Sequence, residues 1–217
     1  MEKRYFFAIR YVPMHVDAGL LAGRCISILH GFLCRHRVEG IGVSFPDWTE
    51  ASLGNSIAFV STDITLLEQL CQQSYFEMMV NDRLFERTGI QLVPKRCREV
   101  RFKRNQSIAK CFPGEKRRRL ERAKRRAEAR GEVFRPVTGN KERQLEPFHS
   151  VLIHSKSSGQ QYLLHIQKEL EPGELSDSFC RYGFATNLKH LGTHPELWGS
   201  DTLFSDEIPE TRQSRTR

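Results

Sequence analysis

One intensely basic segment divides this chain of 217 residues into two unlike parts. Residues 95–130 contain 16 Lys and Arg and only 4 Glu, whereas the remaining residues contain 18 Lys and Arg and 22 Asp and Glu. The protein is therefore an ordinary acidic chain that carries one strongly cationic element. A solvated charged face is the alternative interpretation, but such faces usually mix both signs. A basic stripe of one sign is typical of a nucleic-acid partner, whose phosphates it neutralises.

The centre of this segment, residues 115–130, is predicted to be a helix with its arginines on one face. Their spacing of three and four residues brings them together, and they are Arg118, Arg119, Arg122, Arg125 and Arg126. The opposite face offers only Leu120, Ala123 and Ala127, so core packing cannot be its main support. Like charges at this spacing repel each other, and a phosphate backbone would remove that repulsion. Arginine suits this task because its planar fork binds phosphate in a bidentate way.

The part before the basic segment alternates strand and helix patterns in the order β-α-β-β-α-β. Aromatic and β-branched runs predict strands, and apolar stripes at helical spacing predict helices. The strands are expected at 4–12, 41–45, 56–60 and 90–93, and the helices at 16–37 and 64–80. This order is the ferredoxin-like arrangement. We therefore predict a ferredoxin-like domain over residues 1–94.

The part that follows predicts a smaller domain of short antiparallel strands around the arginine-rich helix, which makes the whole chain α+β. Extended segments are expected at 97–108, 148–154, 162–167 and 179–184. The Ser-rich stretch 155–160 is expected to be a hairpin connection, although its hydroxyl and N–H groups could instead cradle a phosphate or ribose. We place this domain at residues 95–198 and expect residues 199–217 to be a disordered tail.

Several classes of protein are excluded by what the sequence lacks. No apolar run approaches the ~20 residues needed to cross a bilayer, and the N-terminus has no signal-peptide core. The six cysteines form no CxxC pair, so they are expected to be reduced thiols of a cytoplasmic protein, neither a disulfide frame nor a zinc site. Walker loops, H-E-x-x-H and paired-carboxylate patterns are also absent, so we expect no metal and no cofactor.

Eight histidines leave the choice of a catalytic base open. His30 lies about 120–140° from the centre of the apolar stripe of its predicted helix, so it is not an obvious core residue. A free imidazole that titrates near pH ~6.5 is a candidate general base. His149, His154 and His165, which lie in the predicted strands, are the alternatives.

Four other residues are candidates for contacts with a nucleic acid or with the catalytic histidine. In an extended segment, Arg104 and Gln106 point the same way and could reach a guanine and an adenine edge, although any exposed strand can contain such a pair. Tyr162 could stack on a base. Tyr182 could form a hydrogen bond with a histidine.

Taken together and in this order, these residues resemble the CRISPR repeat-RNA endoribonucleases of type I-F systems. The resemblance runs from about residue 4 to residue 184. The overall pattern also resembles a branch of the family that is found in transposon-associated systems. It is carried by short stretches in both parts of the chain: Leu29-His30-Gly31, Ile41–Pro46, Arg104-x-Gln106-Ser107, Arg117–Leu120, Ser155-x-Ser157-x-Gly159-Gln160 and Phe179-x-x-Tyr182-Gly183. The family has a ferredoxin-like N-terminal domain and a C-terminal domain with an arginine helix.

The resemblance implies roles for the residues of the catalytic site. His30 matches the catalytic histidine and Ser155 the serine that holds the attacking ribose, with Ser157 as its neighbour. Tyr182 matches the tyrosine that positions the histidine. Tyr162 falls where the family often has a phenylalanine that stacks under the cleavage site.

The resemblance also implies which residues bind the RNA. Arg104 and Gln106 match the pair that reads base edges at the foot of the hairpin. Arg119 and Arg122 match helix arginines that lie in the hairpin groove. At the position where the family pattern has its next arginine, this sequence has Ala123.

The function implied is cleavage of a CRISPR repeat hairpin by metal-independent attack of a 2′-OH, which leaves a 2′,3′-cyclic phosphate and a 5′-OH. The enzyme would keep the 3′ hairpin of the guide RNA. Its expected partners are the backbone subunits of a type I-F surveillance complex and, in the transposon-associated branch, a transposition adaptor protein. Two alternatives remain, a hairpin-binding subunit without cleavage and a basic adaptor that binds DNA or protein and lacks the ferredoxin-like order.

Overall fold

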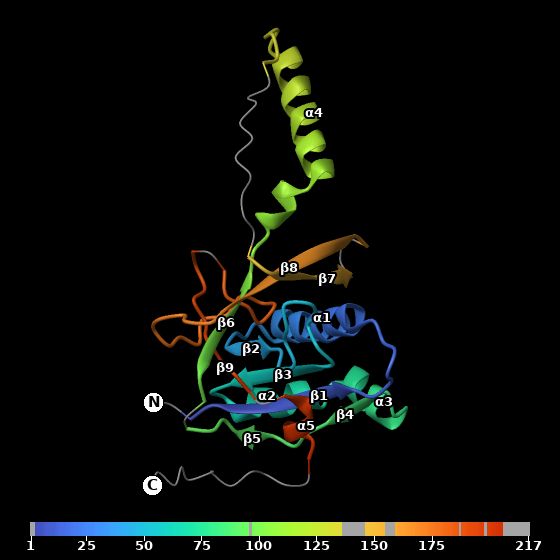
Figure 1. The fold of residues 1–217 in the computed structure, drawn as a ribbon, viewed down its shortest axis with the longest axis vertical. Coiled ribbons are helices and arrows are strands. Elements are labelled where there is room, and N and C mark those ends of the chain that lie inside the picture. The colour runs from blue at the N-terminus through green and yellow to red at the C-terminus, as the bar shows by residue number, and fades with distance from the viewer. Residues whose placement is uncertain are drawn as a thin grey trace, which may run out of the picture.

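The computed structural model describes residues 3–95, 97–135, 146–154, 159–186, 188–197 and 199–205. Figure 1 shows a body of sheets and helices from which one long helix, α4, projects. Among the described residues, no helix is both long and apolar enough to cross a membrane.

The N-terminal part has the predicted ferredoxin-like arrangement. Its strands are β1 (Tyr5–Tyr11), β2 (Ile41–Ser44), β3 (Ser56–Ser61), β4 (Phe85–Arg87) and β5 (Gln91–Leu92), and its helices are α1 (Ala18–His36), α2 (Ile64–Cys71) and α3 (Ser74–Asn81). The sheet order is β2-β3-β1-β4, with β5 also paired to β1, and every pairing is antiparallel. The α+β fold class is therefore confirmed.

The predicted helix at 64–80 is in fact two helices, because the chain turns between Cys71 and Ser74. Gln73 has an extended backbone (φ −64°, ψ 132°) and begins α3 without a side-chain cap. The break lets Leu67 and Leu70 of α2 and Phe76 of α3 all reach the core. Burial of three large side chains thus outweighs the continuity of one helix.

The C-terminal part forms a second antiparallel sheet in the order β7-β8-β6-β9. Its elements are β6 (Glu99–Arg104), the 3₁₀ turn η1 (Ile108–Cys111), α4 (Pro113–Ala129), β7 (Phe148–His154), β8 (Gln161–Glu169), β9 (His194–Pro195) and α5 (Ser200–Leu203). The arginine-rich helix and the strands at 148–154 and 162–167 lie where the sequence predicts them.

Three expectations for this part differ from the structure. The extended segment expected at 97–108 ends at Arg104, where the chain turns into η1. The strand expected at 179–184 is a turn around Gly183. Ordered structure also continues past residue 198, since α5 buries Leu203 against Phe6 and Val60 of the N-terminal sheet.

One core joins the two sheets. Alternate residues of β1 and β3 pack on the three N-terminal helices, and the same cluster continues into β6, β7 and β8. The contact between α1 and β7 is so close that a Cβ at Gly23 would lie 2.2 Å from the carbonyl oxygen of Leu152. Helix α1 therefore lies between the N-terminal sheet and β7 (Figure 1). The boundary at residue 94 stays a prediction.

Candidate active site

His30 on α1 and Tyr182 in the turn after β8 pack face to face. Their ring centroids are 4.2 Å apart and their planes differ by 6°. The structure thus brings together two of the residues that the sequence predicts to be catalytic. Both are partly exposed, so an external ligand can reach them.

The same turn fixes the orientation of the imidazole. Nδ1 of His30 donates a hydrogen bond to the carbonyl oxygen of Arg181 at 3.1 Å. Because a carbonyl only accepts, this bond leaves the proton of a neutral imidazole on Nδ1 and the lone pair on Nε2. The sulfur of Cys34, one helical turn along α1, lies 3.8 and 3.7 Å from Nδ1 and Nε2. This arrangement suits a general base that accepts a proton at Nε2.

The turn that carries Arg181 and Tyr182 is anchored to β2. Gly183 has a left-handed backbone (φ +79°), and a Cβ there would lie 2.5 Å from a methyl group of Val43. The Gly183 carbonyl accepts hydrogen bonds from the Val43 amide at 2.8 Å and from Nε2 of His194 at 3.1 Å. Glycine is required here, because any side chain would push the turn away from β2.

His194 is a site residue that the sequence does not reveal. It is fully buried, and its Nδ1 accepts a hydrogen bond from the Phe102 amide at 3.3 Å while Nε2 donates to Gly183. Burial lowers the pKa of His194 to about 3, so the ring is neutral and can make both bonds. No local pattern marks it, because its two partners come from distant segments.

Two further residues hold Tyr182. The hydroxyl groups of Tyr162 on β8 and Tyr182 lie 2.5 Å apart, and the Arg104 guanidinium lies 5.0 Å from the centroid of the Tyr182 ring. Burial, followed by the hydrogen bond to Tyr162, raises the pKa of the Tyr182 hydroxyl. Nε of Arg104 is buried and has no hydrogen-bond partner among the described residues. Side chains from α1, β6, β8 and the turn therefore converge at one place.

Gln106 lies beyond the end of β6 and does not alternate with Arg104 along a strand. Its side-chain amide donates to the Leu163 carbonyl at 3.2 Å and accepts from the His165 amide at 3.3 Å. These two bonds hold the side chain on β8. One N–H and one lone pair of the amide remain for a ligand.

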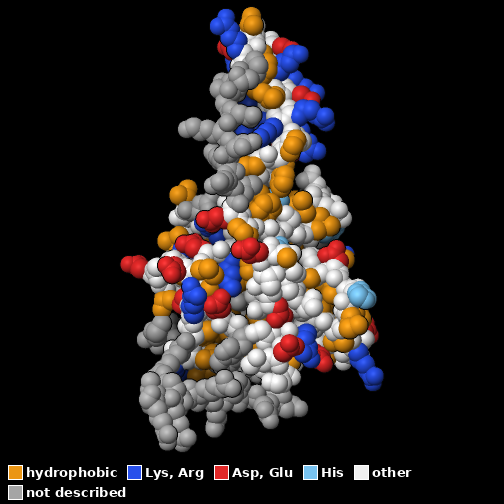
Figure 2. Space-filling model, in the orientation of Figure 1, with side chains coloured by type: hydrophobic (Ala, Val, Ile, Leu, Met, Phe, Trp, Pro, Cys, Tyr) orange, Lys and Arg blue, Asp and Glu red, His pale blue; other side chains and the backbone are white. Residues whose placement is uncertain are grey.

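Helix α4 presents the predicted arginine face to solvent. The five arginines of this face are exposed, and Figure 2 shows Lys and Arg side chains along the projecting helix. Glu115 pairs with Arg118 at 2.8 Å and with Arg122 at 3.7 Å. Within the part of the chain that the structure describes, no carboxylate pairs with Arg119, Arg125 or Arg126.

Two cations on the other side of α4 are paired with carboxylates of the same helix. Arg117 pairs with Glu121 and Lys124 with Glu128, each at 3.8 Å and one helical turn apart. The helix therefore has one face of excess positive charge and one of mixed charge. This asymmetry suits binding of a polyanion along the arginine face.

The other sequence candidates have varied surroundings. Nε2 of His149 donates to the Thr49 carbonyl at 2.8 Å, and His165 is buried with its Nδ1 2.8 Å from the Ser150 hydroxyl. Burial lowers the pKa of His165. His154 is exposed at the end of β7. Ser155 and Ser157 lie outside the described residues.

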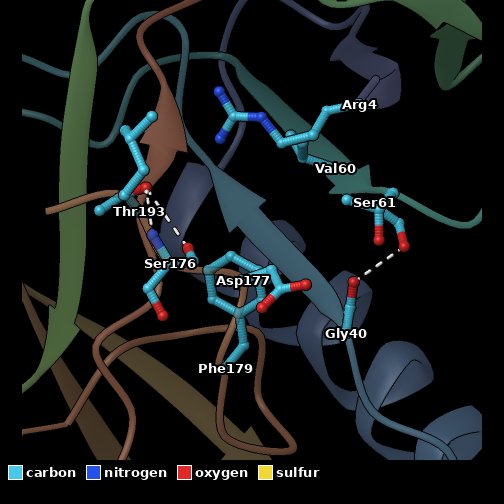
Figure 3. A pocket seen from close by; sticks show the side chains of 10 residues that line it. Arg4, Gly40, Val60, Ser61, Ser176, Asp177, Phe179 and Thr193 are labelled. Carbon is cyan, nitrogen blue, oxygen red and sulfur yellow. Dashed lines mark hydrogen bonds between the residues drawn. The ribbon is translucent and has the colours of Figure 1, made fainter. Parts of the chain in front are cut away.

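A pocket of about 250 Å³ lies away from these residues, between the start of β2, the end of β3 and the segment before β9 (Figure 3). Its lining includes the apolar side chains of Val60, Leu175 and Phe179. Two of its hydroxyl groups bond to backbone carbonyls of the lining, Ser61 to Gly40 and Thr193 to Ser176. No residue of the candidate active site lines it.

Comparison with known families places this site in context. A family model described as "CRISPR-associated protein (Cas_Csy4)" matches residues 6–195. The matched region includes His30, Arg104, Tyr162, Tyr182 and all of α4. A search of curated proteins finds no match. Since the family model matches most of the sequence, the chain belongs to the Csy4 family of CRISPR-associated proteins.

Proposed function

We propose that this protein is a metal-independent endoribonuclease that cleaves a CRISPR repeat hairpin and then keeps the 3′ hairpin of the guide RNA. Membership of the Csy4 family makes it a CRISPR-associated protein that processes repeat RNA. The proposal rests on one observation, the imidazole of His30 fixed by the Arg181 carbonyl and the Tyr182 ring. An imidazole held in this way has its lone pair on Nε2, where it can take a proton.

The proposed reaction uses a nucleophile that belongs to the RNA. Nε2 of His30 removes the proton of the 2′-OH, and the oxygen attacks the adjacent phosphorus. The bond from phosphorus to the 5′-oxygen breaks, and that oxygen takes a proton from the imidazolium. The products are a 2′,3′-cyclic phosphate and a 5′-OH. No step needs a metal ion, because an imidazole supplies and removes the proton.

Two effects account for the rate enhancement. Alignment of the 2′-OH with the phosphorus makes the attack intramolecular, which can remove about 7–11 kcal/mol of the barrier. Proton transfer to His30 contributes roughly 10²–10⁴-fold. The Tyr182 ring lies against the imidazole and stabilises the imidazolium through its π face. We assign Ser155, which follows the last residue of β7, to hold the attacking ribose, with Ser157 beside it.

RNA binding is divided between α4 and the sheet. The arginine face of α4 lies along the phosphates of the hairpin, where it contributes affinity without sequence preference. Arg104 and Gln106 read base edges at the foot of the hairpin. Support for this role of Arg104 comes from its buried Nε, which has no hydrogen-bond partner among the residues that the structure describes. The Tyr162 ring stacks under the terminal base pair.

The A-form major groove is too narrow for side chains to read in general. A short hairpin, whose groove opens near the loop, resolves this difficulty. Most contacts of the arginine face are then to phosphates.

The partners follow from the retained hairpin. We propose that the protein joins the backbone subunits of a type I-F surveillance complex in the cytoplasm, and a transposition adaptor if it belongs to the transposon-associated branch. Co-purification of tagged protein with these subunits and a guide RNA tests this part. Recovery of the guide RNA without them would limit the proposal to RNA processing.

The decisive experiment is incubation of the purified protein with a hairpin-forming repeat RNA in EDTA, followed by mapping of the ends. We expect one cut at the foot of the hairpin, with the two product ends given above. RNA with a 2′-deoxy sugar at the cut should bind but remain intact. Binding without cleavage of the normal RNA would favour a non-catalytic hairpin-binding subunit, and activity that returns only with Mg²⁺ would exclude the proposed mechanism.

A further inference from the structure

We propose that Tyr162 is a positioning residue, whose hydroxyl holds the Tyr182 ring in place over His30. This inference rests on the proposed function and deepens it. Base stacking needs only an aromatic ring at position 162, so the hydroxyl has no task in RNA binding. The hydrogen bond to Tyr182 gives the Tyr162 hydroxyl a role within the protein.

The bond lies at the tip of the Tyr182 side chain. The two hydroxyl oxygens are 2.5 Å apart, whereas the Tyr182 backbone belongs to the turn around Gly183. The hydroxyl oxygen lies on the axis of the Cβ–Cγ bond, so a restraint there limits rotation about the Cα–Cβ bond and fixes where the ring lies. Contact with the imidazole and with Arg104 then sets the plane of the ring.

Tyr162 is a firm anchor because it lies within a paired strand. It is the second residue of β8 and lies opposite Ile153 of β7. Its neighbours along β8, Leu164 and Ile166, are fully buried. A side chain on a packed strand holds its position better than one on a loop. The hydroxyl bond therefore ties the side chain of a turn residue to a packed sheet.

Two contacts of His30 depend on that turn. Tyr182 covers the imidazole face, and the carbonyl of the preceding residue, Arg181, accepts from Nδ1. A shift of the turn would rotate the imidazole and misdirect the Nε2 lone pair. Misalignment at the reacting atom lowers the rate of the chemical step and leaves binding unchanged. The Tyr162 hydroxyl should thus affect the cleavage rate more than the affinity.

The test compares Tyr162→Phe, Tyr182→Phe and the double variant in single-turnover cleavage of the repeat hairpin. Each single variant keeps its ring and loses the shared hydrogen bond, so we expect a rate about fivefold lower. The double variant should be no slower than the slower single variant, since both remove the same bond. RNA affinity should change less than about twofold in all three variants. The control is Tyr5→Phe on β1, for which the cleavage rate and the RNA affinity should both change less than about twofold.

A second readout does not depend on activity. In protein with isotope-labelled histidine and no RNA, the stacked Tyr182 ring shifts the His30 ring signals, which His30→Ala identifies. Tyr182→Leu gives the position of the His30 signals when no aromatic ring lies against the imidazole. We expect Tyr162→Phe to move the His30 signals toward that position.

The outcomes separate the two proposals. Unchanged His30 signals in Tyr162→Phe, or a double variant whose rate loss is the product of the two single losses, would overturn the role of Tyr162. If the unmodified protein does not cut the RNA, the proposed function fails. The histidine signals then still decide whether the Tyr162 hydroxyl holds Tyr182 on His30.

Discussion

Nε2 of His194 donates a hydrogen bond to the carbonyl of Gly183. Gly183 follows Tyr182, whose ring stacks on His30. A fully buried histidine thus supports the candidate active site from behind. Its support depends on a neutral ring, because Nδ1 must accept from the Phe102 amide at the same time. The stability of the protein is therefore linked to the protonation of this one side chain.

This linkage predicts acid sensitivity below the ordinary pKa of histidine. The folded pKa of His194 is lowered to about 3, so between pH ~3 and ~6.5 the unfolded chain binds a proton that the folded protein does not. Stability then falls as the pH falls through this range, by about 1.4 kcal/mol per pH unit. Urea unfolding at pH 7, 6 and 5 measures this slope.

A variant isolates the contribution of His194 from that of other groups. His194→Gln should be less stable at pH 7 and should lose stability less steeply between pH 6 and 5 than the unmodified protein. His149→Gln, a change at a histidine of the second sheet, serves as the control. Parallel pH profiles for His194→Gln and the unmodified protein would contradict the prediction.

Replacement of His30 should separate chemistry from binding. His30→Ala removes the proposed base, so cleavage should slow by roughly 10²–10⁴-fold. Hairpin affinity should stay nearly the same, because phosphate contacts dominate such an interface. Cleavage assays and equilibrium binding test this together, with His36→Ala at the exposed end of α1 as the control. Normal cleavage by His30→Ala would assign the base to another residue, with His154 the next candidate.

The two faces of α4 should differ in their effect on salt dependence. Arg119→Ala and Arg122→Ala each remove one phosphate contact, so the slope of log affinity against log salt should flatten by about 0.7–0.9. Arg117→Ala is the matched control, since Arg117 lies on the mixed-charge face and pairs with Glu121. Binding titrations at several salt concentrations check this. Equal slopes for all three variants would mean that the arginine face does not bind the RNA backbone.

Arg104 should determine sequence preference instead. Arg104→Lys keeps the positive charge but loses the bidentate geometry, so preference at one base pair near the cut should weaken by about 1–3 kcal/mol. Affinities for hairpins with each base pair at the foot exchanged measure this effect. Arg119→Ala should weaken binding to every hairpin by a similar factor. Unchanged preference in Arg104→Lys would show that another residue reads the base.

The sequence predicts the N-terminal fold well because local patterns specify it. The aromatic and β-branched run of β1 and the apolar stripe of α1 both correspond to side chains that are buried. Local pattern also explains the wrong prediction at 179–184. The aromatic residues Phe179, Tyr182 and Phe184 are typical of a strand, although the segment is a turn. The positive φ of Gly183 and its contact with Val43 decide for a turn, and neither can be read from local sequence.

The candidate site is predictable only in part. His30, Tyr182 and the α4 arginines stand in recognisable patterns, and the structure puts the first two in contact. His194 stands in none, because its partners Phe102 and Gly183 become its neighbours only in the folded chain. The bond between Tyr162 and Tyr182 is likewise a product of tertiary structure.

The close packing of Gly23 against the Leu152 carbonyl has a mechanical consequence. Helix α1 carries His30 and belongs to a core shared by both sheets, so the two sheets cannot swing apart without breaking that core. Within the described residues, the candidate active site therefore needs no hinge between the sheets, and the proposed RNA ligand would dock onto a surface that is already assembled. Under the proposed function, release of a cut hairpin would depend on how fast its phosphates leave the arginines of α4, and slow dissociation would need no lid.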